Sequence, residues 1–382
     1  MLLAVVIVNY KVKYFAAQAV EAALAATRGM DARIYLVDNA SGDDSIAYLR
    51  ARYPEVCYIQ NDNNEGFAKA NNRAVRASQS RYVLLLNPDT IIGPDTLRKA
   101  LDHMEQNERT AAVGVRMHDA RGNFLPESKR GSVSLWSCAC RFLGLARCFP
   151  KSRLFNRYYA GWLDKGEMHS VGLLSGAFML LRRKAFEEAG LLDERYFMYG
   201  EDIDLSYTLR KLGYRCDYLP LPILHYKGES EAASGNRIRY RNAFFGAMQL
   251  FYAKHHPHNK LGQFLIAKAI PLLARRKEKA HSTVIPSVPT RSELNLLSID
   301  LTPLTPTTLP EGRNLLVTLT PDTYDSFLKL LVESEGRGCT FYTSRPDDGI
   351  ILGPATVLPP KNQYCSLTLL LIAHCAVLHL LV

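Results

Sequence analysis

Short β-rich runs alternate with helix-forming segments along the first 120 residues of the chain. In order, the predicted elements are strand 2–10, helix 14–27, strand 33–38, helix 43–52, strand 56–61, helix 66–78, strand 82–87 and helix 94–106. Strands that are joined through helices form βαβ units, and the helices then cover both faces of a parallel sheet. The alternation therefore predicts an α/β fold that begins with a parallel sheet.

The carboxyl ends of these predicted strands are unusually polar. Ligands of open parallel sheets bind outside the carboxyl ends of the strands. The polar residues at these ends are Asn9, Asp38, Asn39, Asn61, Asn87 and Asp89. We therefore expect the chemistry of the protein at this edge of the sheet.

The remainder of the chain divides by composition and periodicity. Residues 123–168 lose the regular pattern, a strand-like run follows at 171–183, and a helix begins at Glu201 and stops at Gly213. The predicted units are a main domain over 1–235, amphipathic helices over 236–280 with a membrane-surface contact, a linker rich in Pro and Thr over 281–313, and a small α/β appendage over 314–382.

Two apolar segments each fit two structures. Residues 132–149 carry only Arg141 and Arg147 as charged groups, which fits a helix in the plane of a membrane interface or a buried helix beside the substrate. Residues 366–382 are slightly shorter than the roughly 20 residues of a membrane-spanning helix. This terminal segment fits either a tail anchor or a packed terminal element.

Charge and cysteine usage narrow the partners and the compartment. The formal net charge of +10 predicts an anionic partner, either nucleotide phosphates or an acidic membrane surface. The chain has no RNP motif, zinc-finger spacing or basic zipper, which argues against nucleic acid. Its eight cysteines are scattered and it opens on a strand pattern instead of a secretory signal, so reduced thiols and a cytoplasmic location are expected.

Two aspartates follow predicted strands and have two interpretations each. The Asp38 carboxylate can accept a hydrogen bond from the N3–H of uracil or thymine, or it can cap the helix that follows. Asp89 follows a run of buried apolar residues, where a single carboxylate fits Mg²⁺ or Mn²⁺ beside substrate phosphates. Its alternative role is to cap the helix near Pro94.

Three later polar segments each have two interpretations when they are taken alone. Residues 63–75 combine a glycine with Lys69 and Asn71, which could reach a ribose or phosphate or form an ordinary polar helix surface. Glu201 and Asp202 lie at a helix N-terminus, where the helix dipole stabilises anions and one carboxylate could act as a general base. His225 fits a packed histidine or a ligand of metal or phosphate.

Taken together and in this order, these segments resemble the family 2 glycosyltransferases. The resemblance is greatest to the rhamnosyltransferase-like branch, which acts in bacterial surface polysaccharide biosynthesis. The segments that carry it are residues 6–11, 37–45, 64–72, 85–90, 175–214 and 225–230.

The resemblance implies a GT-A catalytic domain over residues 1–235, in which a Rossmann-like nucleotide-binding sheet is fused to an acceptor-binding half. It implies inverting, metal-dependent transfer from a dTDP- or UDP-sugar to a hydroxyl of a lipid-linked saccharide at the cytoplasmic face of the plasma membrane. By resemblance, Asp202 is the general base with Glu201 beside it, and Asp89 and His225 contact the Mg²⁺ or Mn²⁺ ion. Donor contacts are expected from Asn9, Asp38, Asn39, Asn64, Gly66, Lys69, Asn71 and Asn87.

Asn87 departs from the family pattern, because it replaces the first acidic residue of the Asp-X-Asp metal motif. Three rival functions fit these motifs to different degrees. A nucleotidyltransferase is disfavoured because residues 9–15 contain no glycine-rich basic loop, and a NAD-dependent enzyme because no G-x-G-x-x-G follows the first strand. A catalytically silent homologue acting as a scaffold stays open, although Asp38, Asp89 and Asp202 are all present.

Overall fold

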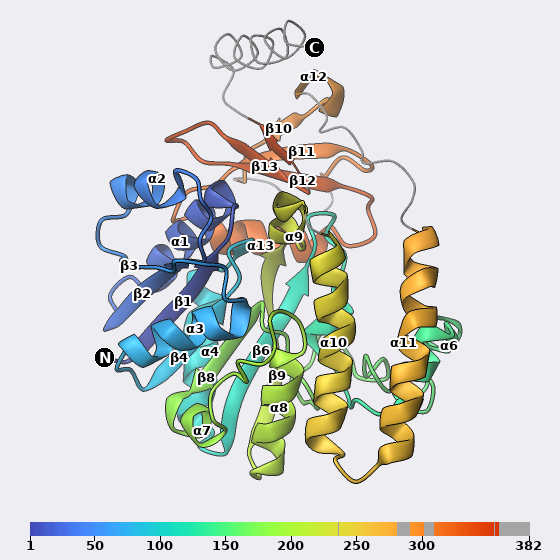
Figure 1. Cartoon of the computed structure of the whole chain (residues 1–382). Helices are drawn as coiled ribbons and strands as arrows, with labels where there is room; N and C mark the ends of the chain where they lie inside the picture. The colour runs from blue at the N-terminus through green and yellow to red at the C-terminus, as the bar shows by residue number, and fades with distance from the viewer. Residues whose placement is uncertain (236, 281–290, 302–308, 355, 359–382) are drawn as a thin grey trace, which may run out of the picture.

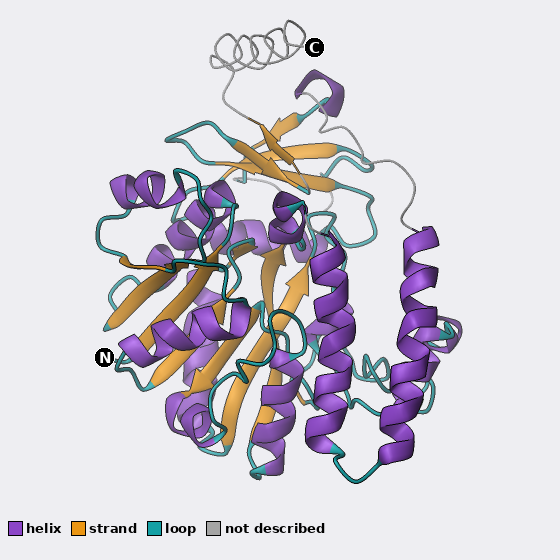
Figure 2. Ribbon diagram, viewed as in Figure 1, coloured by secondary structure: helices purple, strands orange, loops and turns teal. Residues whose placement is uncertain are grey.

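The computed structural model describes residues 1–235, 237–280, 291–301, 309–354 and 356–358. A central mixed sheet is covered on both faces by helices, and a smaller sheet adjoins it (Figures 1 and 2). The apolar segment 366–382 lies outside the described residues. Within the described part of the chain, no helix is both long enough and apolar enough to cross a bilayer.

The first half of the central sheet is parallel, as the alternation predicts. Its strand order is β3-β2-β1-β4. The elements are β1 (Leu3–Asn9), α1 (Lys13–Ala26), β2 (Ala32–Asp38), α2 (Ser45–Arg52), β3 (Cys57–Gln60), α3 (Phe67–Ala77) and β4 (Tyr82–Leu86). Each lies within a few residues of its predicted range, which confirms the α/β prediction.

The second half of the sheet mixes strand directions. From β4 outward the order is β8-β6-β9-β5; β8 is antiparallel to both β4 and β6, β6 and β9 are parallel, and β5 is antiparallel to β9. The elements are β5 (Thr90–Ile91), α4 (Pro94–Gln106), β6 (Thr110–His118), η1 (Pro126–Ser128), β7 (His169–Ser170), β8 (Phe178–Arg182), α7 (Arg183–Glu188), α8 (Glu201–Lys211) and β9 (Arg215–His225). A short strand, β7, pairs with β9.

Two hydrophobic cores form on the two faces of this sheet, because successive side chains of a strand point to opposite faces. Leu3, Val5 and Ile7 of β1 pack with α1 and α4 on one face. Ala4 and Val6 pack with α3 and α8 on the other. Every residue of β1 is buried, which agrees with a strand covered on both sides.

Helices outside the sheet build one side of the molecule. They are α5 (Leu135–Phe142), α6 (Leu145–Cys148), α9 (Glu229–Ser234), α10 (Arg237–His255) and α11 (Lys260–Ala280). The range 237–278, predicted as helical, is two helices that run side by side as a hairpin (Figure 1). The apolar run 132–149 is broken at Gly144, which has a φ of 82°. It therefore forms two short helices instead of one.

The C-terminal part folds around a second sheet of order β10-β11-β12-β13-β14. Its elements are α12 (Arg291–Leu294), β10 (Leu297–Ile299), β11 (Asn314–Thr318), α13 (Tyr324–Glu333), β12 (Thr340–Ser344), β13 (Ile351–Gly353) and β14 (Thr356–Leu358). Strand β10 lies inside the range 281–313, which was predicted as a linker. The prediction missed this strand because three residues between Pro- and Thr-rich stretches give no periodic signal. Helix α13 packs on α4 and β9 and shares their hydrophobic core, so this unit is not detached from the main domain.

Candidate active site

Pairing of β5 with β9 brings Asp89 and His225 together. Thr90 is the antiparallel partner of His225, and the Tyr226 N–H donates to the carbonyl of Asp89 at 3.0 Å. The His225 Nε2 atom lies 3.4 Å from Asp89 Oδ1 and 3.4 Å from Asn87 Nδ2. These residues come from two segments far apart in the sequence, and only the β5–β9 register places them side by side.

Asp89 and His225 are both buried, and their polar atoms are not fully used by the chain. Burial would raise the pKa of Asp89, but the neighbouring His225 imidazole lowers it, and the net pKa lies below the ordinary aspartate value. The Nδ1 atom of His225 has no hydrogen-bond partner among the described residues. Buried polar atoms are rarely left without a partner, so this atom indicates room for a ligand.

This pair fits a divalent cation that arrives with its own oxygen ligands. No cluster of three or more His, Cys, Asp or Glu residues in the described part of the chain could hold a metal ion unaided. Mg²⁺ is commonly bound through one or two carboxylates together with substrate phosphates. The donor set of Asp89 and His225 therefore fits a cation bound jointly with a diphosphate.

Two adjacent carboxyl groups, those of Glu201 and Asp202, begin helix α8. Asp202 Oδ2 accepts hydrogen bonds from Arg130 Nη2 at 2.7 Å and from the Gly176 N–H at 3.2 Å. Arg130 is buried, and a backbone bridge to Leu173 fixes its position. Asp202 is therefore held in a partly buried ion pair with Arg130. No periodicity in the irregular 123–168 region indicated that Arg130 would supply the cation.

The carboxyl group of Glu201 has a raised pKa. Burial, and next the adjacent Asp202 carboxylate, raise the pKa of Glu201 to about 8. Its Oε2 atom is buried and has no hydrogen-bond partner among the described residues. At neutral pH Glu201 is therefore mainly protonated.

Hydrogen bonds within the chain occupy most of the Asp38 carboxylate. It accepts from Asn9 Nδ2 at 2.8 Å, from Ser41 Oγ at 2.6 Å and from the Ser41 N–H at 3.1 Å. Asn9 and Asp38 are direct partners in the parallel β1–β2 register. The two residues therefore lie at the carboxyl ends of β1 and β2, where Asp38 holds the loop that leads into α2.

A cavity of about 450 Å³ lies beside these groups. The predicted site residues on its wall are Asn39, Asn64, Asn87, Asp89, Glu201, Asp202 and His225. The predicted residues that do not line it are Asn9, Asp38, Gly66, Lys69 and Asn71. The structure thus brings Asp89 and His225 to the same cavity as Glu201 and Asp202. The other residues expected to bind the donor do not line this cavity.

Local contacts explain the positions of three residues that do not line the cavity, Gly66, Lys69 and Asn71. Gly66 has a φ of 87°, and a Cβ atom on it would lie 2.3 Å from the carbonyl oxygen of Phe197. This glycine therefore permits close approach of the Phe197 backbone. Lys69 pairs with Glu65 at 3.0 Å on the surface, and Asn71 Nδ2 donates to the Phe67 carbonyl at 2.8 Å.

Helices α5, α10 and α11 form the other wall of the cavity, which is mainly apolar. It includes Leu135, Cys138, Arg141 and Phe142 of α5, Phe244, Met248 and Phe251 of α10, and Ile266 of α11. Sequence patterns marked these helices as apolar or amphipathic, but nothing in the patterns indicated that they face the carboxylates of α8. Loop residues Tyr10, Tyr158 and Tyr159 complete the wall.

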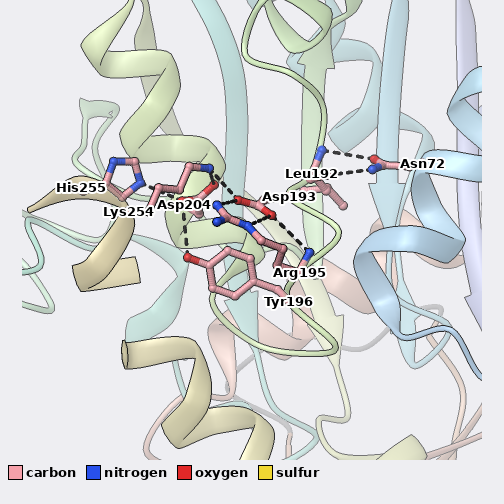
Figure 3. A network of polar contacts seen from close by, with 8 residues as sticks. All are labelled: Asn72, Leu192, Asp193, Arg195, Tyr196, Asp204, Lys254 and His255. Carbon is pink, nitrogen blue, oxygen red and sulfur yellow. Dashed lines mark hydrogen bonds and ion pairs between the residues drawn. The ribbon is translucent and has the colours of Figure 1, made fainter. Parts of the chain in front are cut away.

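A largely buried ionic network joins the hairpin to α8 (Figure 3). Asp204 accepts from Lys254 Nζ and from His255 Nε2, both at 2.7 Å, and Lys254 also bonds Asp193 at 2.8 Å. Asn72 of α3 holds the neighbouring loop by donating to the Leu192 carbonyl at 2.8 Å. Asp204 thus anchors α10 and is not one of the residues that line the cavity.

The arrangement of the sheet defines the class of protein. A parallel βαβ half fused to a mixed half within one sheet, with acidic residues at the junction, is the GT-A architecture of glycosyltransferases. Residues 4–190 match the family model described as Glycosyl transferase family 2. The chain belongs to this family, and it is a glycosyltransferase.

Known proteins similar to this chain are transferases of sugars. An N-acetylglucosaminyl-diphospho-decaprenol L-rhamnosyltransferase of Mycobacterium tuberculosis is 31% identical over 209 residues, which cover 52% of this chain and 67% of the relative. The rhamnosyltransferase WbbL of Escherichia coli K12 is 29% identical over 47% of this chain and 66% of its own length. The solved structure of a Pyrobaculum calidifontis mannosyltransferase with GDP-Man and Mn²⁺ is 15% identical and covers 74% of this chain and 76% of that chain, with a TM-score of 0.47.

Proposed function

We propose that the protein is an inverting glycosyltransferase that moves a sugar from a dTDP- or UDP-linked donor to a hydroxyl group of a lipid-linked saccharide. The observation that carries this proposal is the shared cavity, which Asp89 and His225 line together with Glu201 and Asp202. A leaving diphosphate beside the first pair and an attacking hydroxyl beside the second would meet there.

In this mechanism the acceptor hydroxyl oxygen attacks the anomeric carbon of the donor sugar. The bond between that carbon and the diphosphate oxygen breaks, the nucleoside diphosphate leaves with the electron pair, and the configuration inverts. Asp202 accepts the hydroxyl proton, because its carboxylate lines the cavity and is oriented by the ion pair with Arg130. Glu201 is a poorer acceptor at neutral pH, since burial raises its pKa to about 8.

Asp89 and His225 would hold Mg²⁺ or Mn²⁺ together with the diphosphate oxygens of the donor. The cation supplies neutralisation of the charge that develops on the leaving nucleoside diphosphate. Asn39, Asn64 and Asn87 line the cavity and would contact the nucleotide directly.

The other residues expected to bind the donor do not line the cavity and would contribute from positions next to it. A carboxylate offers about four acceptor positions, and the chain uses three at Asp38, so one is left for the N3–H of uracil or thymine. Asn9 would orient that carboxylate. Gly66, Lys69 and Asn71 would support the ribose side of the site through the start of α3.

The acceptor is proposed to be lipid-linked because the other wall is apolar and two of its helices, α5 and α11, also carry exposed apolar side chains. Leu261, Phe264 and Leu265 lie on one face of α11 and are each at least half exposed. Lys260 and Lys268 flank them, and Trp136 and Leu143 are exposed near the α5 wall. An exposed apolar patch with basic neighbours fits the surface of an anionic membrane, here the cytoplasmic leaflet. The M. tuberculosis relative is named for a diphospho-decaprenol acceptor.

Calorimetric titration with UDP and with dTDP, each with and without Mn²⁺ or Mg²⁺, tests the donor site. We expect metal-dependent binding by the wild type, loss of that dependence in Asp89→Ala, and no change in the control Asp102→Ala, whose side chain is exposed on α4. Asp202→Asn should retain nucleotide binding but lower kcat for sugar transfer by about 10²–10⁴-fold. Binding without any transfer by the wild type would favour the silent scaffold, and no nucleotide binding would reject the donor site.

A further inference from the structure

The described cavity wall carries three Arg or Lys side chains, and two of them are paired with acids. Arg130 pairs with Asp202, and Lys227 pairs with Glu127. Arg141 has no carboxylate within ion-pair distance among the described residues. Its guanidinium carbon lies 4.8 Å from the ring centre of Tyr158 and 5.5 Å from that of Tyr159. The cavity therefore contains one cation that is positioned by aromatic rings and still has its charge available.

The fold of α5 directs this cation into the cavity. Ser134 caps the helix, because its Oγ accepts from the Ser137 N–H at 3.1 Å and the two residues form a capping box. Leu135, Cys138 and Arg141 follow at intervals of three and therefore share one helix face, which lines the cavity. The same helix exposes Trp136, so the segment has a cavity face and an outer face.

A chain of side-chain contacts connects Arg141 to the proposed base. Arg130 contacts both Asp202 and Tyr158, and Tyr158 lies beneath the Arg141 guanidinium. Arg130 and Tyr158 thus connect the proposed proton acceptor to Arg141, and all four residues line the same cavity. Beyond Arg141 the wall continues with apolar groups such as Phe142 and Ile266.

We infer that Arg141 binds the phosphate or diphosphate that joins the acceptor saccharide to its lipid. This inference rests on the proposed function, in which the attacking hydroxyl lies at Asp202. The guanidinium hydrogen-bonds phosphate oxygens with charge assistance, and the apolar wall formed by α5 and α11 accommodates the start of the lipid chain. Arg141 thereby distinguishes acceptors that carry this anionic linkage from neutral glycosides.

Two acceptor probes separate this role from a structural one. The first is N-acetylglucosamine on a short-chain prenyl diphosphate, and the second is the same saccharide on an uncharged alkyl glycoside. We expect Arg141→Gln to weaken calorimetric binding of the diphosphate probe by about tenfold or more, and Arg141→Lys to restore much of it. Binding of the neutral glycoside and of UDP or dTDP should stay unchanged, as should all binding by the control Arg147→Gln, whose side chain is exposed outside the cavity.

Several outcomes would overturn the inference while leaving sugar transfer intact. They are failure of the wild type to bind the diphosphate probe, equal weakening of both probes by Arg141→Gln, or weakening of nucleotide binding instead, which would assign Arg141 to the donor.

Vesicles of phosphatidylcholine with phosphatidylglycerol test the lipid headgroup as the source of phosphate. Arg141→Gln should bind them as the wild type does, and a selective loss would show that Arg141 contacts the membrane surface. Absence of transfer to either probe by a wild type that binds both would reject the proposed function alone.

Discussion

The hydroxyl groups of Tyr226 and Thr343 lie 2.6 Å apart and connect the C-terminal sheet to the residue that follows His225. Gln18 of α1 reinforces the contact by donating to Thr343 Oγ1 at 2.9 Å. Tyr226 is buried, and its N–H donates to the Asp89 carbonyl. The unit predicted as an appendage therefore supports the backbone that holds Asp89 and His225 together.

Thr343→Val should weaken both the fold and the metal-dependent binding of nucleotide. Valine keeps the shape of threonine but leaves the buried Tyr226 hydroxyl with only the longer 3.4 Å contact to Gln18. We expect the free energy of unfolding in a denaturant titration to fall by about 1–3 kcal/mol, with weaker UDP binding in the presence of Mn²⁺. The control Thr318→Val, at an exposed position of β11, should change stability by less than about 0.5 kcal/mol. Equal effects of the two variants would contradict the supporting role of this contact.

Glu201→Gln should change the pH dependence of stability. Burial and the adjacent Asp202 raise the pKa of Glu201 from 4.5 to about 8, so the native state holds a proton that the unfolded state loses above pH 4.5. The resulting stabilisation is full below pH 4.5 and is lost as the pH rises toward 8. The glutamine variant has no proton to lose, and its stability relative to the wild type should rise over this window.

Denaturant unfolding of Glu201→Gln and the wild type at several values between about pH 5 and pH 8 measures this trend. Glu108→Gln, at an exposed position, serves as the control and should follow the wild type at every pH. Parallel pH curves for Glu201→Gln and the wild type would show that this carboxyl group is ionised in the native state.

Lys254→Met should loosen the hairpin from α8. Lys254 lies between Asp193 and Asp204, and its removal leaves two largely buried carboxylates with fewer partners (Figure 3). Because the lysine side chain is 28% exposed, we expect a loss of about 2 kcal/mol in the free energy of unfolding, below the range for fully buried pairs. Lys184→Met, at an exposed position of α7, is the matched control and should have little effect. A loss no greater than that of the control would show that the network does not anchor α10.

Replacing Leu261, Phe264 and Leu265 together by serine should reduce binding to anionic vesicles. These side chains form the exposed apolar face of α11, and their burial in a lipid interface contributes free energy in proportion to the apolar area covered. Vesicle co-sedimentation measures the effect, with Leu212→Ser as a control at another exposed leucine. Transfer to a short water-soluble acceptor should be retained. Unchanged sedimentation of the triple variant would exclude this face as the membrane contact.

Much of the fold follows from local patterns, whereas the cavity does not. The buried runs that became β1, β2 and β4 and the helices between them were predicted because strand and helix periodicities are local properties. Strand β10 was missed because it is short and its partner β11 lies beyond a Pro- and Thr-rich stretch. Arg130 and Arg141 were not predicted as site residues, since an irregular segment gives no pattern that shows where a side chain points.

The order of strands and helices in the first half, and the polar character of the strand ends, were determined by the sequence alone. Tertiary structure decided which of those polar residues share a cavity. Asn87 and His225 lie 138 positions apart and meet only through the β5–β9 register, and Asp202 faces them because α8 packs against the same sheet. Contacts between distant segments depend on strand register and helix packing, and a local pattern carries no information about either.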